Sequence, residues 1–129
     1  MSFDLSELSD VTNQEGIVSI IHPKTGVELG IKITVASRDS AKYRKMESLV
    51  KNRNTAALQR GKRNLSAEAI DAGMLDILAA CVVGWEGLEW GGQAIECTDH
   101  NIRDVYEKFP FIREQVEEFV NDRGNFISA

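Results

Sequence analysis

Cysteine, histidine and long apolar runs are scarce in this chain of 129 residues, and each shortage excludes a class of protein. Two cysteines, Cys81 and Cys97, are too few for the disulfide framework of a small secreted domain. No apolar run approaches the roughly 18 residues that a membrane-spanning helix requires, so we expect no membrane association. Residues 1–7 are acidic and lack the basic and apolar regions of a signal peptide. We therefore expect a cytoplasmic protein with reduced thiols.

Residues that commonly carry catalysis are missing or isolated. The two histidines, His22 in a predicted turn and His100 near a predicted helix start, lie outside any recognisable nucleophile motif. Glu86 and Glu89 could form an acid/base pair, but carboxylates beside exposed aromatics are more commonly solubilising groups. The glycines between residues 84 and 92 fit no phosphate-binding pattern. The sequence therefore predicts a protein that is not an enzyme.

The few cysteines and histidines also limit the possible metal sites. Cys97 and His100 form one closely spaced pair, whereas structural zinc sites need about four converging ligands. Cys81 lies on the apolar face of a predicted helix, where a free cysteine behaves as a small hydrophobe. We expect no metal site and no cofactor.

Charge is present in ordinary amount but is unevenly distributed. The chain has a net charge of −5, yet residues 42–63 contain eight lysines and arginines against the single acid Glu47. This window carries +7 and the remainder −12. One interpretation is a solvated helix face followed by a mobile basic loop. The other is a surface for an acidic partner, nucleic acid, or a second copy of the chain.

Nucleic-acid binding by this basic segment is not expected. Single-strand binders interleave aromatic residues with cations so that bases can stack, and Tyr43 is the only aromatic residue in the window. The chain as a whole is also acidic.

The first half of the chain predicts a β-hairpin. Residues 16–21 are rich in β-branched apolar residues, and residues 22–26 have the proline and glycine of a turn. Residues 27–35 then alternate, which places five side chains on one face: Val27, Leu29, Ile31, Ile33 and Val35. Residues 1–15 are expected to be a flexible arm, and residues 16–127 a single domain with no internal boundary.

Four helices are predicted to follow. The first begins at Ser37 or Asp39 and weakens at residues 52–54, so that residues 52–64 are the candidate linker. Helical spacing predicts its buried residues as Tyr43, Met46, Leu49 and Val50. The second is capped by Ser66, and its buried stripe is Ile70, Met74, Ile77, Leu78, Cys81 and Val82.

The last two helices meet at a proline. One is capped by Thr98 or Asp99, and the other begins near Pro110, where a missing amide costs nothing. The final helix is expected to close at Gly124, leaving residues 125–129 as a tail. The predicted fold class is therefore α+β, with an N-terminal β-hairpin packed against about four helices.

Residues 82–95 contain both tryptophans and four of the ten glycines. Gly84 suits a left-handed helix stop, and Trp85, directly after it, is expected to be a packing anchor. Trp90 lies at a predicted turn and has two interpretations, a core residue or an exposed anchor for a partner, because large aromatics are enriched at binding hot spots.

Several segments in a fixed order resemble one protein family. They are His22-Pro23-Lys24-Thr25-Gly26, Leu29-Gly30-Ile31-Lys32-Ile33, Arg38-Asp39-Ser40-Ala41-Lys42-Tyr43-Arg44, Gly84-Trp85-Glu86-Gly87-Leu88, residues 95–102, Phe109-Pro110-Phe111-Ile112 and Asn125-Phe126. Their order and spacing over roughly residues 16–127 resemble the tail assembly chaperones of long-tailed double-stranded DNA bacteriophages and their prophages. The most specific parts are Asp39-Ser40 with Tyr43-Arg44, and the Gly84 to Gly87 junction.

This resemblance implies a non-catalytic protein with a mixed α/β fold, made in the host cytoplasm and absent from the mature virion. Its partners would be the tape measure protein, the tail tube subunit and a frameshifted longer form of itself, with a tendency to self-associate. An amphipathic partner helix is read by apolar grooves or patches. The candidate contact residues are Lys42, Tyr43, Arg44, Lys45 and Trp90.

Two other functions stay open from the sequence. One is a small tail or head–tail joining protein that is retained in the virion. The other is a regulator that binds nucleic acid.

Overall fold

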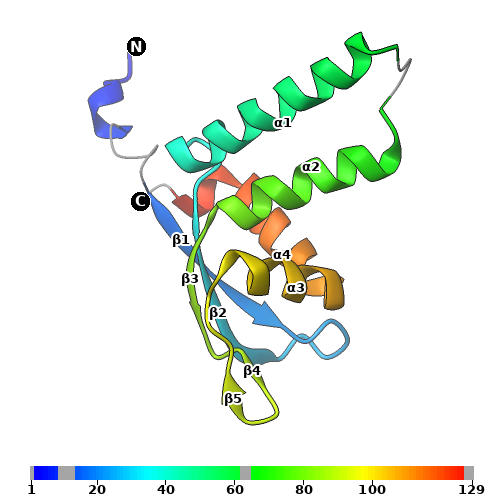
Figure 1. Ribbon diagram of the computed structural model, residues 1–129. Helices are drawn as coiled ribbons and strands as arrows, with labels where there is room; N and C mark the ends of the chain where they lie inside the picture. The colour runs from blue at the N-terminus through cyan, green and yellow to red at the C-terminus, as the bar shows by residue number, and fades with distance from the viewer. Residues whose placement is uncertain (1, 9–13, 62–64, 127–129) are drawn as a thin grey trace.

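In the computed structural model, which describes residues 2–8, 14–61 and 65–126, the predicted β-hairpin is confirmed (Figure 1). Strand β1 (Glu15–Ile21) pairs antiparallel with β2 (Glu28–Ala36). Alternate β1 residues are buried, as the period of a half-buried strand requires. In β2 this pattern holds only near its end, where Ile33 and Val35 are buried. The predicted apolar face is therefore wrong at the start of β2, where Leu29 and Val27, the residue just before the strand, are exposed.

A third strand, which the sequence did not predict, completes the sheet. Strand β3 (Val82–Glu86) pairs antiparallel with the second edge of β2, in the order β1-β2-β3. The predicted helix stop at Gly84 is wrong, because α2 (Ala67–Ala80) ends earlier and Gly84 lies inside β3 opposite Thr34. The fold remains a single α+β domain, with a three-stranded sheet in place of a lone hairpin.

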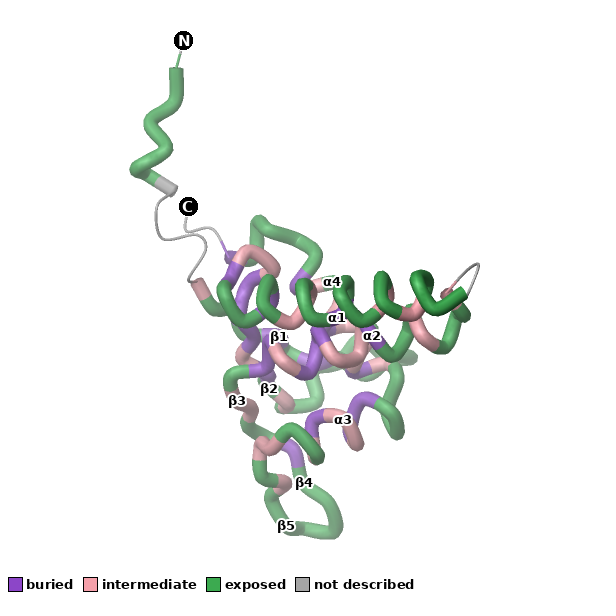
Figure 2. Tube along the Cα trace, turned by 45° about the horizontal axis from the view of Figure 1, so that its top comes forward, coloured by how far each residue is buried: buried purple, intermediate pink, exposed green. Residues whose placement is uncertain are grey.

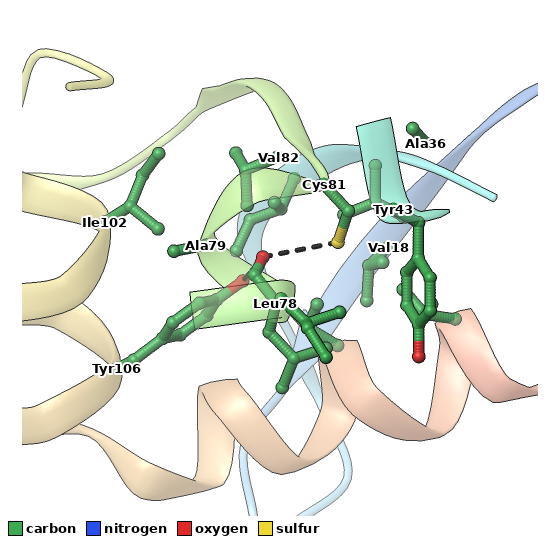
Figure 3. Close-up of a cluster of buried hydrophobic side chains, with 14 of the residues drawn as sticks. Val18, Ala36, Tyr43, Leu78, Ala79, Cys81, Val82, Ile102 and Tyr106 are labelled. Carbon is green, nitrogen blue, oxygen red and sulfur yellow. Dashed lines mark hydrogen bonds between the residues drawn. The ribbon is translucent and has the colours of Figure 1, made fainter. Parts of the chain in front are cut away.

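Helix α2 is followed by strand β3 without a glycine at the junction, and two side-chain hydrogen bonds at the end of the helix account for this. The last carbonyls of a helix lack intrahelical donors and need other partners. The Leu78 carbonyl accepts hydrogen bonds from the Tyr106 hydroxyl and from the Cys81 thiol, both at 3.2 Å (Figure 3). Two buried side chains therefore satisfy this carbonyl.

Helices α1 (Ala41–Gln59) and α2 form a hairpin that projects from the sheet (Figure 1). Ser40 caps α1 by accepting from the Tyr43 amide, and Ser66 caps α2 by accepting from the Ala69 amide. The start predicted at Ser37 or Asp39 is therefore slightly early. The linker predicted over 52–64 is largely wrong, because α1 continues to Gln59; residues 62–64 lie outside the described residues.

Some residues that were predicted to be buried on these two helices are exposed in the structure. Tyr43, Val50, Ile77 and Leu78 are buried, but Leu49 and Ile70 are more than half exposed. Close approach of the helices is made possible by Gly73, since a Cβ there would lie 2.7 Å from Val50 Cγ1.

Helices α3 (Asp99–Lys108) and α4 (Pro110–Asn121) complete the fold. Thr98 caps α3, and Pro110 occupies the first turn of α4 as predicted. The predicted closure of this helix at Gly124 is wrong, and so is the predicted tail at Asn125 and Phe126; residues 127–129 of that tail lie outside the described residues. A 3-10 helix (Arg123–Phe126) follows α4, and Phe126 is buried at 2% exposure.

Burial is concentrated where the sheet, α2, α3 and α4 meet (Figure 2). At the N-terminus, a 3-10 helix (Leu5–Leu8) contains exposed residues, and residues 9–13 lie outside the described part. The predicted arm over 1–15 is one residue too long, because Glu15 begins β1.

Three sets of ion pairs connect the helical hairpin and its entry to the rest of the domain. Asp76 on α2 binds Arg53 on α1 at 2.9 Å and Arg103 on α3 at 2.6 Å. Asp71 on α2 binds Arg113 on α4 at 2.8 Å. Asp39, before α1, binds Arg123 after α4 at 2.8 Å.

Candidate functional site

Trp90 is displayed at the tip of a small hairpin. Strand β4 (Glu89–Trp90) pairs with β5 (Gln93–Ala94) through a turn made by Gly91 and Gly92. Both glycines have positive φ, 59° and 84°, as a two-residue hairpin turn that follows the strand twist requires. The Trp90 side chain is 66% exposed, so of its two interpretations the structure places it at the surface.

An apolar groove lies beside this tryptophan. It has a volume of about 300 Å³ and is formed by the start of β2, the β3–β5 segment, the end of α3 and the start of α4. Its lining residues are Leu29, Ile31, Gly87, Leu88, Glu89, Trp90, Ile95, Val105, Phe109, Phe111 and Ile112. Leu29, Trp90 and Phe109 are all at least 36% exposed, so the groove wall is apolar and accessible to solvent. Exposed apolar side chains around a groove make it a candidate interaction site.

A close backbone crossing forms one end of the groove. Gly87 has φ +83°, and a Cβ atom on it would overlap the Gly30 carbonyl oxygen. Gly30 itself has φ +80°, at a position where the β1–β2 register is irregular. Because neither position has a side chain, the chain after β3 lies directly against β2 and brings Leu88 beside Ile31 in the groove.

Trp85 holds the base of the same segment. Its indole Nε1 donates to the Ile95 carbonyl at 2.8 Å, and the Ile95 amide donates to the Leu88 carbonyl at 2.9 Å. Trp85 is partly buried against the core and lies opposite Ile33 in the sheet. The two tryptophans thus differ in surroundings: Trp85 ties the segment to the domain, and Trp90 faces solvent.

A lysine lies over the exposed tryptophan. Lys108 Nζ is 5.6 Å from the centroid of the Trp90 ring and 3.1 Å from the Asp104 carboxylate. These three side chains line a second hollow of about 240 Å³ next to the groove, together with Ile95, Asn101, Val105 and Phe109. Among the described residues that line the two hollows, Lys108 is the single cation, and Glu89 and Asp104 are the acids.

The basic residues predicted to contact a partner lie elsewhere. Lys42, Arg44 and Lys45 are exposed on the first turns of α1, at the end of the domain opposite the β4–β5 hairpin (Figures 1 and 2). Tyr43 is 4% exposed and belongs to the core cluster, where burial raises the pKa of its hydroxyl. The prediction that Tyr43 contacts a partner is therefore wrong. The structure does not bring the basic residues and Trp90 into one site.

The other candidate chemical groups are not assembled into a centre. No group of three or more histidine, cysteine or acidic side chains is placed to hold a metal ion within residues 2–8, 14–61 and 65–126. Burial raises the pKa of Cys81 to about 12, and also raises that of Cys97. Glu86 pairs across the sheet with Lys32, whereas Glu89 belongs to β4. None of the described helices has the length and apolar character to cross a membrane.

Sequence reasoning missed most of the groove. Leu29 and Ile31 fit the alternation of a half-buried strand, so the sequence predicts them on its apolar face, and Phe109 falls just before the proline that separates two predicted helices. Leu88 carried no periodic signal at all. The two glycines at 30 and 87 were the available clue, because an isolated glycine in a strand pattern often marks a close backbone approach.

Comparisons of the chain with protein-family models, with curated proteins and with solved structures find no match.

Proposed function

We propose that this chain is a non-catalytic assembly chaperone of bacteriophage tails, which binds the tape measure protein and assists polymerisation of the tail tube. The observation that carries the proposal is the apolar groove beside the exposed Trp90. The resemblance in the order of segments, from the His22 turn to Phe126, supports the same function.

The groove suits a helical partner that would otherwise aggregate. A tape measure protein is expected to be a long, helix-rich chain, and an amphipathic helix is bound by inserting its apolar side chains into a groove. Trp90 would supply a large, rigid contact at the rim, as tryptophans do at binding hot spots. Leu88 and Val105 are buried lining residues and would form the floor. Covering apolar side chains of the partner keeps it soluble until tube subunits replace the chaperone.

The exposed cations of α1 supply a second contact in this proposal. Lys42, Arg44 and Lys45 would bind acidic segments of the tape measure protein, of the tail tube subunit or of another copy, including a frameshifted longer form. The protein would act in the host cytoplasm and be absent from the mature virion.

Co-expression with the tape measure protein tests the proposal. We expect the wild-type chain to keep that protein soluble and to co-purify with it, and Trp90→Ala to weaken both effects at least tenfold. Ile17→Ala is the matched control, because Ile17 is 59% exposed on β1, away from the groove lining. If no complex forms, or if both variants behave as wild type, the proposal is wrong.

Two further measurements separate this function from the alternatives. Charge reversal at Lys42, Arg44 and Lys45 should reduce tape measure solubility or self-association, and unchanged values of both would remove α1 from the interaction. Mass spectrometry of purified virions should find no copy of this chain. Its presence there would favour a structural tail or joining protein instead.

A further inference from the structure

We propose that the groove selects a basic amphipathic helix, meaning one whose apolar side chains are flanked by lysines or arginines. This inference deepens the proposed function and rests on it for the identity of the partner. The binding chemistry is argued from the groove alone.

The position of Lys108 identifies the face of Trp90 as a cation site. The electron-rich face of an indole ring attracts a cation within about 6 Å of its centroid. Lys108 Nζ lies at 5.6 Å, and it is also held by Asp104 at 3.1 Å. The chain's own lysine therefore occupies the place that a cation of the partner would take. Its side chain is 57% exposed, so it can swing into solvent when a partner arrives.

The surroundings of the groove are acidic. Among the described residues that line the groove and the adjoining hollow, Glu89 and Asp104 are the acids and Lys108 is the single base. Lys108 is paired with Asp104, which leaves the Glu89 carboxylate as the excess charge of the lining. Glu89 is exposed in the lining itself. A flanking lysine or arginine of the partner would thus meet uncompensated negative charge, whereas a flanking glutamate would be repelled.

The apolar lining of the groove determines which uncharged side chains the partner helix must present. Leu88, Val105 and Ile112 are buried at the floor, and Phe109 and Trp90 stand at the rim. Such a surface accepts apolar side chains that recur at i, i+3 and i+4 along a helix. In a helix with an apolar stripe and basic flanks, the apolar side chains would contact the floor and the cations would contact Trp90 and Glu89 at the rim.

Two synthetic amphipathic helices test the inference with the intact chain. They share one leucine face and differ only in flanking residues, arginine and lysine in one and glutamate in the other. Titration calorimetry should show at least tenfold tighter binding of the basic peptide, with an affinity that falls as salt is added. Trp90→Ala should lower the affinity at least tenfold, and Trp90→Phe should lower it less because a ring remains.

The sign of the effect at Lys108 separates the two possible partners. Lys108→Ala frees the Trp90 ring and the Asp104 carboxylate, so binding of the basic peptide should tighten about two- to fivefold. An acidic partner would instead lose affinity. Glu89→Lys should weaken binding of the basic peptide, while Glu118→Lys, an exposed acid on α4 outside the groove lining, should leave it unchanged. Thermal unfolding of each variant verifies that the fold is retained.

Three results would overturn the inference. The first is equal or tighter binding of the acidic peptide, and the second is weaker basic-peptide binding by Lys108→Ala. The third is that Trp90 becomes buried as the protein concentration is raised without any peptide, and that this burial is lost when the charges of Lys42, Arg44 and Lys45 are reversed. That result would assign the groove to α1 of a second copy.

Failure of this inference and failure of the proposed function give different results. If the affinity for the tape measure protein falls in Trp90→Ala but is unchanged in Glu89→Lys and Lys108→Ala, only the preference for a basic helix is refuted. Basic-peptide binding with the expected signs, but no tape measure complex, would refute the chaperone function alone.

Discussion

Tyr106 shows how one hydroxyl group positions the transition from helix to strand. Its side chain is 2% exposed, and its hydroxyl donates to the Leu78 carbonyl near the end of α2. This bond and the Cys81 thiol occupy a carbonyl that would otherwise be buried without a donor (Figure 3). The chain can therefore turn from α2 into β3 within two residues.

Tyr106→Phe should lower the free energy of unfolding by about 1 kcal/mol, since it removes one buried hydrogen bond and little volume. Denaturant unfolding measures the change. Tyr43→Phe is the matched control, because Tyr43 is also a core tyrosine, at 4% exposure, and no hydrogen bond joins its hydroxyl to another described residue. Equal losses in the two variants would contradict this role of Tyr106.

Substitutions at Gly87 and Gly92 distinguish the stability cost of a positive φ from the cost of a steric clash. Both have φ near +84°, but a Cβ atom would overlap the Gly30 carbonyl oxygen only at Gly87, and at Gly92 it would meet open space. We expect Gly92→Ala to cost about 1 kcal/mol and Gly87→Ala about 3 kcal/mol or more. Thermal unfolding of the pair measures the difference. If the two variants are equally stable, the crossing against Gly30 does not constrain the fold.

At the scale of elements, Gln115 protects the free edge of β1. Its side-chain amide accepts from the Ile21 amide and donates to the Ile21 carbonyl, both at 2.9 Å. The side chain thus makes the two bonds that a neighbouring strand would make. An unprotected edge is a template for pairing with another chain, so this contact also limits aggregation.

Gln115→Ala should raise the hydrogen-exchange rate of the Ile21 amide about five- to tenfold, because the amide loses its acceptor. Gln115→Glu retains an acceptor and should protect Ile21 partly. Glu118→Ala, one turn further along α4, serves as the control and should leave this exchange rate at its wild-type value. Unchanged exchange in Gln115→Ala would show that the bond does not form in solution.

The elements were predictable where one periodic signal dominated. The β1–β2 hairpin and the start of α4 at Pro110 followed from alternation and from proline geometry. Strand β3 could not be predicted because Val82 continues the apolar spacing of α2. The Tyr106 hydroxyl, which binds the Leu78 carbonyl near the end of this helix, lies 28 residues further along the chain. The groove was hidden for a related reason, since Leu29 and Phe109 have core-like spacing and their exposure depends on how distant elements meet.

At the scale of the molecule, ion pairs hold the helical hairpin against the body. Asp76 is central, because it joins α1, α2 and α3 through Arg53 and Arg103 while only 17% of its side chain is exposed. Burial opposes the ionisation of this carboxyl group, but hydrogen bonds from the two arginines outweigh that effect and lower its pKa. Ionised Asp76 therefore stabilises the folded state.

This shift sets the direction of a pH effect. Because the folded pKa of Asp76 lies below its ordinary value of 3.8, its contribution is complete above that pH and is lost as pH falls through the folded pKa. Asp76→Asn should cost about 1–2 kcal/mol at pH 7 and much less near pH 2. Urea unfolding across this range tests the prediction, with the exposed Glu114→Gln as control. A pH-independent difference would contradict it.

The buried ring of Phe126 has a consequence for synthesis on the ribosome. It packs edge-on against Phe119 with 5.4 Å between ring centroids, and both rings lie against the Cα of Gly16. A strand translated near the beginning is thus covered by a side chain translated more than a hundred residues later. Until Phe126 has been released from the exit tunnel, the nascent chain cannot close its core around β1, and this apolar surface is available to cellular chaperones.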